Sequence, residues 1–225
     1  NRDADAGGVG MRAAEQHWRV GIFAFDDMEL LDFAGPYEVF TTASRVAQKM
    51  DLPIRFTVQT VVSGTAAIHA RAGLQMMADV SLNEVGVYDL LIVPGGAVDA
   101  LLCDECVLTW LREAHAHTRY TASICTGAFV LAQAGLLRGC ATTHWEDVND
   151  LRVAQPQLNV LDDVRWVQDS ADERVFSSAG ISAGMDLSLH LLGLLAGAEL
   201  AQKTAQQMDY LGDWQSHQTI KRDNR

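Results

Sequence analysis

The amino-acid sequence predicts an α/β domain with a mostly parallel sheet that is covered by helices on both faces. Short apolar runs, typical of strands buried on both sides, alternate with longer segments of helical character. With 225 residues and 48% hydrophobic composition, the chain is long enough to build one substantial core. Strands and helices that alternate at this length are expected to form parallel β-α-β units within a single domain.

The first half of the chain alternates strands with helices. A continuous apolar run predicts the first buried strand, and Gly35-Pro36 indicates a helix start because proline is tolerated at the first helical position. Pro94-Gly95-Gly96 marks a turn at the end of a later strand. The elements expected here are a strand over 20–25, a helix from about 35, strands over 55–62 and 90–93, and a helix over 105–117.

The second half continues the alternation and adds a hairpin. The turn-rich Asp169-Ser170-Ala171-Asp172 separates two β-type runs, which predicts paired strands that feed the sheet. The elements expected here are a strand over 120–124, a helix that stops near 135, a short strand over 140–143, a helix from about 146, hairpin strands over 164–168 and 174–178, and helices over 181–197 and 198–210. We expect one domain over 18–212, with 1–17 as a leader or vector-derived segment and 213–225 as a C-terminal tail.

Composition and charge exclude several classes of function. The formal charge is 17 − 29 = −12, so this chain alone is not expected to bind nucleic acid, and a small uncharged substrate fits better. The most apolar run, 187–200, is shorter than the roughly 20 residues that a membrane span requires, so we expect a buried helix and no membrane partner. Four cysteines without a recognisable signal peptide indicate a reducing cytoplasm, and we expect no disulfides.

Cys125 is the strongest candidate for chemistry. It lies between a short β-type run and a helix that opens with small residues, in Ser123-Ile124-Cys125-Thr126-Gly127-Ala128. This is the layout of a nucleophile elbow, in which a sharp strand-to-helix turn projects a side chain outward. A helix N-terminus also favours the thiolate, which is the reactive form of cysteine. The sequence therefore predicts a nucleophilic thiol, with Thr126 offering a hydroxyl at the first helical position.

Asp32 is a candidate acid at the same edge of the sheet. It lies among apolar residues shortly after the first predicted strand, and the carboxyl ends of parallel strands gather where such sheets bind ligands. A carboxyl in this setting tends to stay protonated, and a nearby thiolate raises its pKa further. It would then donate a proton to a substrate. The alternative is that Asp32 is an N-cap for the helix expected at Gly35.

Further residues at the expected ligand edge complete the candidate site. The N–H groups of Gly95 and Gly96 are candidates for an anion-stabilising site, since glycine permits close backbone approach. Gly180 and Ile181, after the last predicted strand, are placed with them at the substrate. His144 is a possible proton carrier, although a lone histidine beside an aromatic residue is more often part of the packing.

A metal site is the weakest of the functional hypotheses. Cys103, Cys106, His115 and His117 supply zinc-ligand types, but they lie on one predicted amphipathic helix, on which all four side chains cannot converge. We therefore expect no metal. Glu38, on the first predicted helix, is expected to be a solvated or partly buried acid.

Five motifs occur in order along the chain: Leu31-Asp32-Phe33-Ala34-Gly35-Pro36, Val93-Pro94-Gly95-Gly96, Ser123-Ile124-Cys125-Thr126-Gly127-Ala128, Ala141-Thr142-Thr143-His144-Trp145 and Ala179-Gly180-Ile181-Ser182-Ala183-Gly184-Met185-Asp186. Their order resembles the ThiJ/PfpI superfamily over about 19–210. The cysteine and histidine motifs together are similar to the isonitrile hydratase branch, and also to the ligand-binding domains of AraC-type regulators. The resemblance implies a flavodoxin-like three-layer sandwich of the class I glutamine amidotransferase-like type, a homodimer, and no cofactor.

The resemblance also implies roles for three residues. In isonitrile hydratases the nucleophilic cysteine acts with an acid and with the threonine that follows it; here these positions are Cys125, Asp32 and Thr126. Relatives with peptidase, deglycase or glyoxalase character often carry histidine after the cysteine, and Thr126 departs from that pattern. The expected function is hydration of an isonitrile to an N-substituted formamide. A ligand-sensing domain of a regulator and a cysteine-based redox sensor remain the alternatives.

Overall fold

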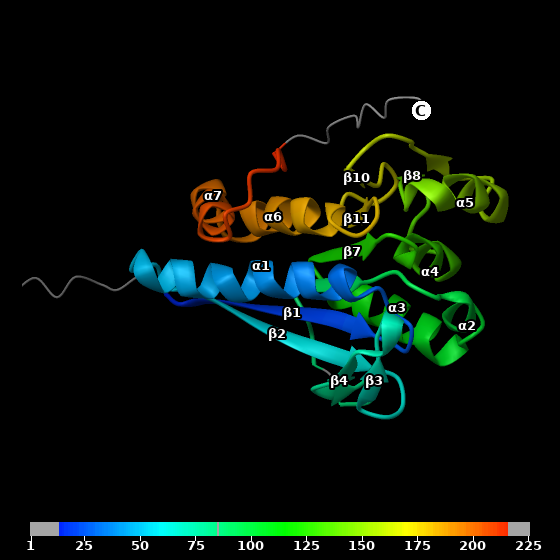
Figure 1. The fold of residues 1–225 in the computed structure, drawn as a ribbon, viewed down its shortest axis with the longest axis horizontal. Coiled ribbons are helices and arrows are strands. Elements are labelled where there is room, and N and C mark those ends of the chain that lie inside the picture. The colour runs from blue at the N-terminus through cyan, green and yellow to red at the C-terminus, as the bar shows by residue number, and fades with distance from the viewer. Residues whose placement is uncertain (1–13, 85, 216–225) are drawn as a thin grey trace, which may run out of the picture.

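The computed structural model describes residues 14–84 and 86–215, and it shows a seven-stranded sheet with helices on both faces (Figure 1). The strand order is β10-β11-β7-β6-β1-β2-β5, and only β10 runs antiparallel to its neighbour. The strands of this sheet are β1 (Gln16–Ala24), β2 (Ile54–Val62), β5 (Val80–Ser81), β6 (Leu90–Val93), β7 (Tyr120–Ile124), β10 (Trp166–Gln168) and β11 (Val175–Ser178). The predicted α/β fold class with a mostly parallel sheet is confirmed.

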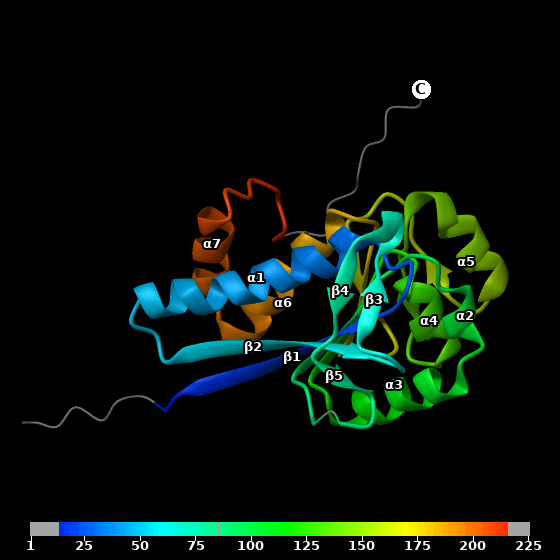
Figure 2. The same ribbon diagram turned by 60° about the horizontal axis from the view of Figure 1, so that its bottom comes forward.

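Helices form the outer layers of the fold, with α1, α6 and α7 on one side of the sheet and α3 and α4 on the other (Figures 1 and 2). Phe56 of β2 packs against Phe40 of α1, whereas Phe23 of β1 packs against Trp110 of α3. Both faces are therefore buried, which explains the apolar runs over 20–24 of β1 and 90–93 of β6. The helices are α1 (Leu30–Lys49), α2 (Asp99–Leu102), α3 (Glu105–His117), α4 (Gly127–Gln133), α5 (Val148–Ala154), α6 (Ala183–Ala196) and α7 (Ala198–Gln207).

The structure also contains short elements outside the main sheet that the sequence analysis did not predict. They are β3 (Ala67–His69) paired with β4 (Gln75–Met77), β9 (Asn159–Val160), and the short 3-10 helices η1 (Arg71–Gly73) and η2 (Trp145–Asp147). The strand expected over 140–143 is present as β8 (Cys140–Ala141), but it pairs with β9 outside the main sheet. Elements of two or three residues carry too little periodicity to be recognised from sequence.

The first helix begins earlier than predicted. It starts at Leu30, so Pro36 lies inside it and Asp32 lies in its first turn. The preceding backbone is fixed by other segments, because the Glu29 N–H donates to the Gly95 C=O at 2.9 Å and Met28 bridges to Gly96. Glu29 occupies the N-cap position. The interpretation of Asp32 as the N-cap of a helix that opens at Gly35 is therefore wrong.

Ordered residues extend beyond both expected ends of the domain. β1 begins at Gln16, so the last two residues of the predicted leader are part of the sheet. Trp214, in the predicted C-terminal tail, is only 6% exposed and belongs to the hydrophobic core. Residues 1–13 and 216–225 of these two segments lie outside the described residues. Within the described part of the chain, no helix is long and apolar enough to cross a membrane.

Candidate functional site

Cys125 lies on a sharp turn between β7 and α4. Its φ is +56°, a left-handed conformation that is uncommon for residues other than glycine and that costs of order 1–3 kcal/mol. Hydrogen bonds hold both backbone polar groups of Cys125. Its N–H donates to the Ser178 C=O at 3.2 Å, and its C=O accepts from the Thr143 hydroxyl at 2.8 Å. The backbone geometry expected of a nucleophile elbow is therefore present.

The ionisation state of Cys125 differs from the expectation. The residue is only 7% exposed, and burial raises the pKa of its thiol to about 12. The negative charges of Asp32 and Asp147 add to this rise, and hydrogen bonds from Thr126 oppose it. α4 has only seven residues, so its N-terminus does not outweigh desolvation. The prediction that the helix N-terminus favours the thiolate is corrected: at rest the thiol is neutral.

Asp32 faces this thiol from the first turn of α1, and it is fully buried. Its Oδ2 accepts a hydrogen bond from the Gly95 N–H at 2.9 Å. Its Oδ1 has no partner with good hydrogen-bond geometry, although the Ile181 N–H and the Cys125 thiol lie close enough to stabilise its charge. Desolvation outweighs these contacts, and with a smaller contribution from Glu29 it raises the pKa of Asp32 to about 7. A carboxyl that gains or loses its proton near neutral pH therefore lies beside the thiol.

These two groups, which we call the acid–thiol pair (Asp32 and Cys125), titrate as one system. The negative charge of Asp32 raises the pKa of Cys125, whereas a hydrogen bond from the Cys125 thiol lowers the pKa of Asp32, and desolvation raises both. The pair therefore releases one proton near pH 7 and the second only in strong alkali. Between these limits the pair holds a single proton. Transfer of that proton from sulfur to the carboxylate produces a thiolate and a neutral acid without changing the net charge. The arrangement can thus supply a nucleophile and a proton donor in one step.

The Pro94-Gly95-Gly96 turn packs directly on the elbow. A Cβ on Gly95 would lie 2.6 Å from the Thr126 N and 2.8 Å from the Cys125 Cβ, so only glycine fits. The Gly96 N–H donates to the Thr126 hydroxyl at 2.9 Å, and this hydroxyl donates to the Gly96 C=O at the same distance. Thr126 therefore fastens the turn to the elbow. Since protein acceptors hold both glycine amides, the oxyanion role expected for them requires one of these bonds to be exchanged.

His144 lies against Gly180. A Cβ on Gly180 would come within 2.1 Å of the His144 ring, so the ring packs directly against this glycine. The His144 Nδ1 lies 3.5 Å from the Asp147 carboxylate and accepts from the Glu146 N–H at 3.3 Å. Burial raises the pKa of Asp147, and the proximity of His144 opposes that rise. The histidine thus contributes to packing and also has a carboxylate partner, so its role as a proton carrier stays a prediction.

The structure brings Asp32, Gly95, Gly96, Cys125, Thr126 and Ile181 together, and His144 packs against Gly180, the residue before Ile181. A model of the DJ-1/PfpI family matches residues 18–194. The chain belongs to the DJ-1/PfpI family. Its sequence is 35% identical to isonitrile hydratase from Pseudomonas putida over 194 residues, which is 85% of this chain and 78% of that protein. It is also 27% identical to the HTH-type transcriptional regulator GbdR from Pseudomonas aeruginosa over 204 residues, 89% of this chain but 53% of the regulator.

Solved structures of DJ-1/PfpI-like proteins share the fold. A THiJ/PfpI family protein from Pseudomonas syringae superposes with a TM-score of 0.76 at 21% identity and covers 94% of this chain and 83% of its own. An AraC family transcriptional regulator from Pseudomonas putida gives a TM-score of 0.70 at 23% identity and covers 85% and 99%. A THiJ/PfpI family protein and a transcriptional regulator therefore share this architecture, which does not by itself indicate a function.

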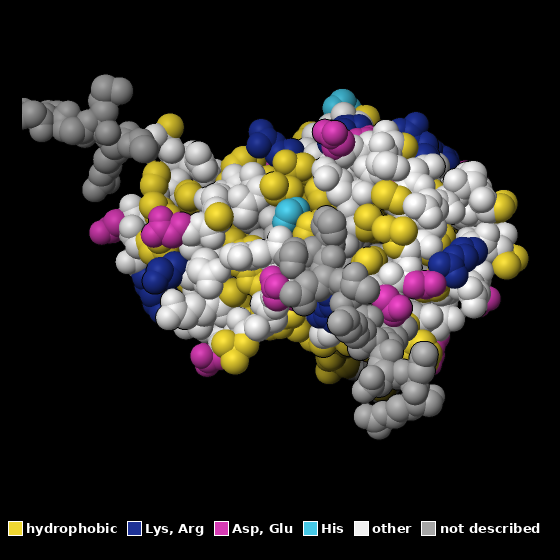
Figure 3. All heavy atoms as spheres, turned by 90° about the horizontal axis from the view of Figure 1, so that it is seen from above, with side chains coloured by type: hydrophobic (Ala, Val, Ile, Leu, Met, Phe, Trp, Pro, Cys, Tyr) yellow, Lys and Arg dark blue, Asp and Glu magenta, His cyan; other side chains and the backbone are white. Residues whose placement is uncertain are grey.

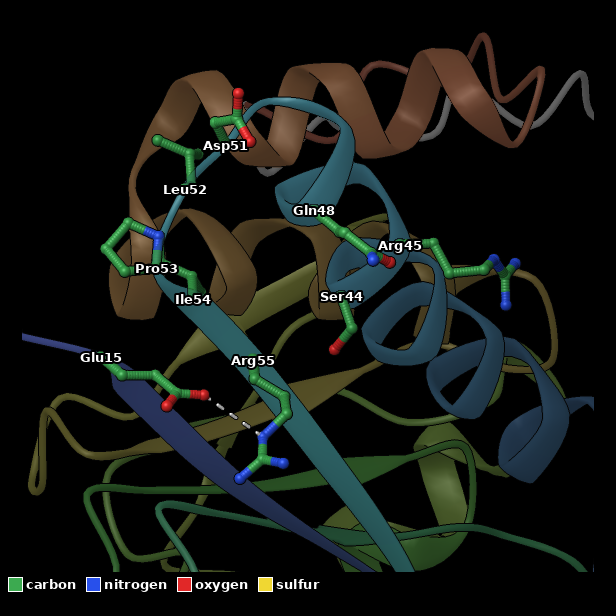
Figure 4. Close-up of a pocket in the computed structure, with 9 residues that line it drawn as sticks. All are labelled: Glu15, Ser44, Arg45, Gln48, Asp51, Leu52, Pro53, Ile54 and Arg55. Atoms are coloured by element: carbon green, nitrogen blue, oxygen red, sulfur yellow. Dashed lines mark ion pairs between the residues drawn. The ribbon is translucent and has the colours of Figure 1, made fainter.

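A wide concavity elsewhere on the surface is unrelated to this chemistry. It measures about 1030 Å³ and lies at the amino ends of β1 and β2, where Arg55 forms an ion pair with Glu15 and the end of α1 forms the opposite wall (Figure 4). Ligands of parallel sheets bind at the carboxyl ends of the strands, so we assign no role to it. A smaller cavity of about 230 Å³ adjoins the elbow, and it is lined by Thr143, Trp145 and Ala179 among others.

Several neighbours of the acid–thiol pair were missed by sequence reasoning. Glu29 and Asp147 act on it through their charges, and Thr143 and Ser178 hold the Cys125 backbone. Thr143 belongs to a motif that was recognised, but nothing in the sequence indicated that its hydroxyl would reach the elbow. The two acids lie outside the strand ends, and only the fold reveals their proximity.

The other cysteines and the histidine-rich helix lie elsewhere. Cys103 and Cys106 are exposed, Cys140 is half-buried, and all of them are free thiols. His115 is buried between Thr121 and Asp172, and burial lowers its pKa. Glu38 forms an exposed ion pair on α1. Among the described residues, no group of three or more potential metal ligands converges.

The charge of the surface is mixed. On the face shown in Figure 3, Lys and Arg side chains lie in separate small groups between apolar and acidic ones. The expectations that the chain does not bind nucleic acid and that it forms a homodimer stay predictions.

Proposed function

We propose that this chain is a cofactor-independent isonitrile hydratase-like enzyme. The observation that carries the proposal is the acid–thiol pair itself: a buried cysteine on an elbow faces a fully buried carboxyl whose pKa is raised to about 7. The 35% identity to isonitrile hydratase from Pseudomonas putida over most of both chains supports the same reaction class. A small uncharged substrate is consistent with a site in which charge is poorly solvated.

The first chemical step joins sulfur to carbon. The Cys125 proton passes to the Asp32 carboxylate, and the thiolate attacks the terminal carbon of R–N≡C. Asp32 then donates the proton to that carbon, which gives the thioimidate R–N=CH–S–Cys. One C–S bond and one C–H bond form, and the pair returns no proton to solvent.

The second step releases the product. Water adds to the thioimidate carbon, and Asp32 passes one proton of this water to the imine nitrogen, which gives R–NH–CH(OH)–S–Cys. Asp32 then accepts the remaining hydroxyl proton as the carbonyl forms. The C–S bond then breaks, the thiolate leaves, and the product is R–NH–CHO. The thiolate recovers its proton from Asp32. The sum is the addition of one water to one isonitrile, and every proton is accounted for. Thr126 supports the elbow by fastening it to the Gly96 turn.

The test is turnover of a panel of alkyl and aryl isonitriles, with formamide measured by proton NMR. Formamide should accumulate with the wild-type chain and be absent with Cys125→Ala. Cys140→Ala is the matched control, because this half-buried thiol donates only to the Gln168 C=O at 3.1 Å. The rate should rise as the pH passes about 7, where the pair loses its first proton. Wild-type protein that is inert toward the whole panel would exclude the proposal.

A second candidate function is ligand sensing in an AraC-type regulator. It is supported by the 27% identity to GbdR over 89% of this chain. Both functions need a site at the elbow, but a sensor needs no turnover. Calorimetry with the same isonitrile panel separates them: saturable binding that survives in Cys125→Ala, without formamide from the wild type, would favour sensing. A coding sequence that continues into a DNA-binding module would favour it as well.

A further inference from the structure

A buried carboxylate, Asp186, joins distant parts of the chain close to the acid–thiol pair. It lies in the first turn of α6 and is 2% exposed. Its Oδ2 is paired with the Arg165 guanidinium, and its Oδ1 accepts from the Tyr210 hydroxyl at 2.5 Å. Arg165 directly precedes β10, whereas Tyr210 follows α7. The cluster therefore ties the hairpin end of the sheet and the C-terminal segment to one turn of α6.

Arg165 holds the segment that leads into α6 at both ends. Its backbone C=O accepts from the Ala179 N–H at 2.9 Å. Its guanidinium lies 3.4 Å from the Ser182 hydroxyl and is bonded to Asp186. Arg165 thus binds both ends of the segment 179–186, which contains the turn that faces Asp32. Because Asp186 is buried, losing a partner would leave a charge poorly compensated, so the cluster is held together strongly.

The first turn of α6 is wedged between the elements that carry the acid–thiol pair. A Cβ on Gly35 of α1 would come within 2.9 Å of the Met185 Cγ. A Cβ on Gly184 would come within 2.8 Å of the side chain of Ile124, the residue before the elbow. The turn is closely packed on both sides. A displacement of the turn must therefore also displace α1 and β7.

We propose that Arg165, Asp186 and Tyr210 are positioning residues, which fix the first turn of α6 and thereby set the separation of the acid–thiol pair and exclude water from it. The proposal rests on the proposed function only in taking that pair as the reacting groups. The three residues do not contact the reacting groups. They affect the acid–thiol pair indirectly, because they fix the position of α6.

The direction of the effect follows from the physical causes of the raised pKa values. Desolvation is the largest cause for both Asp32 and Cys125. If the turn loosens, water enters and both pKa values fall toward their ordinary ranges. The charges that face the pair, Glu29 on Asp32 and Asp147 on Cys125, act in the same direction, because water screens their repulsion. A loosened site therefore holds a more acidic carboxyl and a more reactive thiol.

The experiment compares Tyr210→Phe and Arg165→Lys with wild type in the full chain. Tyr210→Phe removes one hydrogen bond and adds no charge. Arg165→Lys keeps the positive charge but loses the planar set of N–H donors of the guanidinium group. Carbon-13 NMR of aspartate carboxyls follows the Asp32 titration, and peptide-resolved mass spectrometry follows alkylation of Cys125 by iodoacetamide against pH. Neither readout uses an isonitrile, so the result is independent of whether the hydratase proposal holds.

The matched control is Asp169→Asn. Asp169 is also a buried carboxylate, and it accepts backbone N–H groups at 138–140 away from the acid–thiol pair. Loss of the Asp169 carboxylate should lower the stability of the fold without changing the midpoint pH of the Asp32 titration. We expect Tyr210→Phe and Arg165→Lys to lower this midpoint and to speed alkylation of Cys125, about tenfold for each pH unit by which the thiol pKa falls. An unchanged midpoint and alkylation profile in both variants, or an equal shift in Asp169→Asn, would overturn the proposal.

Discussion

Replacing the buried acid should remove activity and, at neutral and alkaline pH, increase stability. Asp32→Asn keeps the shape of the side chain and an oxygen that accepts from the Gly95 N–H. It cannot hold a transferable proton, so it should abolish turnover. It also carries no charge, and the native carboxylate is destabilising because it is ionised in a buried position. A catalytic group that costs stability in its working form is common at active sites.

The magnitude follows from the raised pKa of Asp32. The rise from 3.8 to about 7 corresponds to about 4 kcal/mol, an order-of-magnitude figure for a fully buried group. The folded state holds the proton more tightly than the unfolded chain, so stability is highest below about pH 4 and falls as the pH rises to about 7. The Asn variant lacks this fall. Its free energy of unfolding should therefore gain about 4 kcal/mol relative to wild type between pH 4 and pH 8.

The assay is urea unfolding of both proteins at pH 4, 6 and 8. An amide group left without a partner costs about 1–3 kcal/mol, but this offset is the same at each pH and cancels from the comparison. Cys125→Ala is the control: it retains the buried carboxyl, so it should keep most of the wild-type fall in stability. A difference between Asp32→Asn and wild type that stays constant from pH 4 to pH 8 would refute the reasoning.

Three further predictions concern the elbow. Iodoacetamide at neutral pH should label the exposed Cys103 faster than Cys125, whose thiol is buried and has its pKa raised to about 12; peptide mass spectrometry that finds Cys125 labelled first would contradict this. Gly95→Ala should lose activity and about 1–3 kcal/mol of stability, whereas Gly193→Ala, whose nearest neighbour would be 3.7 Å away, should be neutral or slightly stabilising in urea unfolding. Thr126→Val should reduce kcat by breaking both bonds to the Gly96 turn, and Thr126→Ser should retain most of it; equal kcat for Val and wild type would count against this role.

The rule that ligand sites form at the carboxyl ends of parallel strands correctly predicted which candidate residues would meet at one edge of the sheet. Asp32, Gly95, Cys125 and Gly180 each follow a strand, and the structure brings them to one edge. The elbow was also readable, since a strand followed by small residues favours a sharp turn. These features depend on local pattern and on chain order, which a sequence displays directly.

The start of α1 could not be predicted, because tertiary contacts set it. Proline at 36 suggested a first helical position, but the backbone before Leu30 is fixed by the bond between Glu29 and Gly95 and by the bridge to Gly96. The helix therefore begins one and a half turns earlier, and Asp32 becomes part of its first turn. A contact between residues more than sixty positions apart leaves no local signal.

By itself, the sequence determined the fold class, and it predicted the edge of the sheet where the candidate residues meet and which of them are the candidate acid and nucleophile. Only the tertiary structure decided their protonation, because the pKa of a side chain depends on burial and on charges from other elements. The helix N-terminus pointed to a thiolate at Cys125, yet desolvation raises its pKa to about 12 and that of Asp32 to about 7. Solvent exclusion is produced by packing among distant segments, and this is the property that turns two ordinary side chains into a proton-sharing pair.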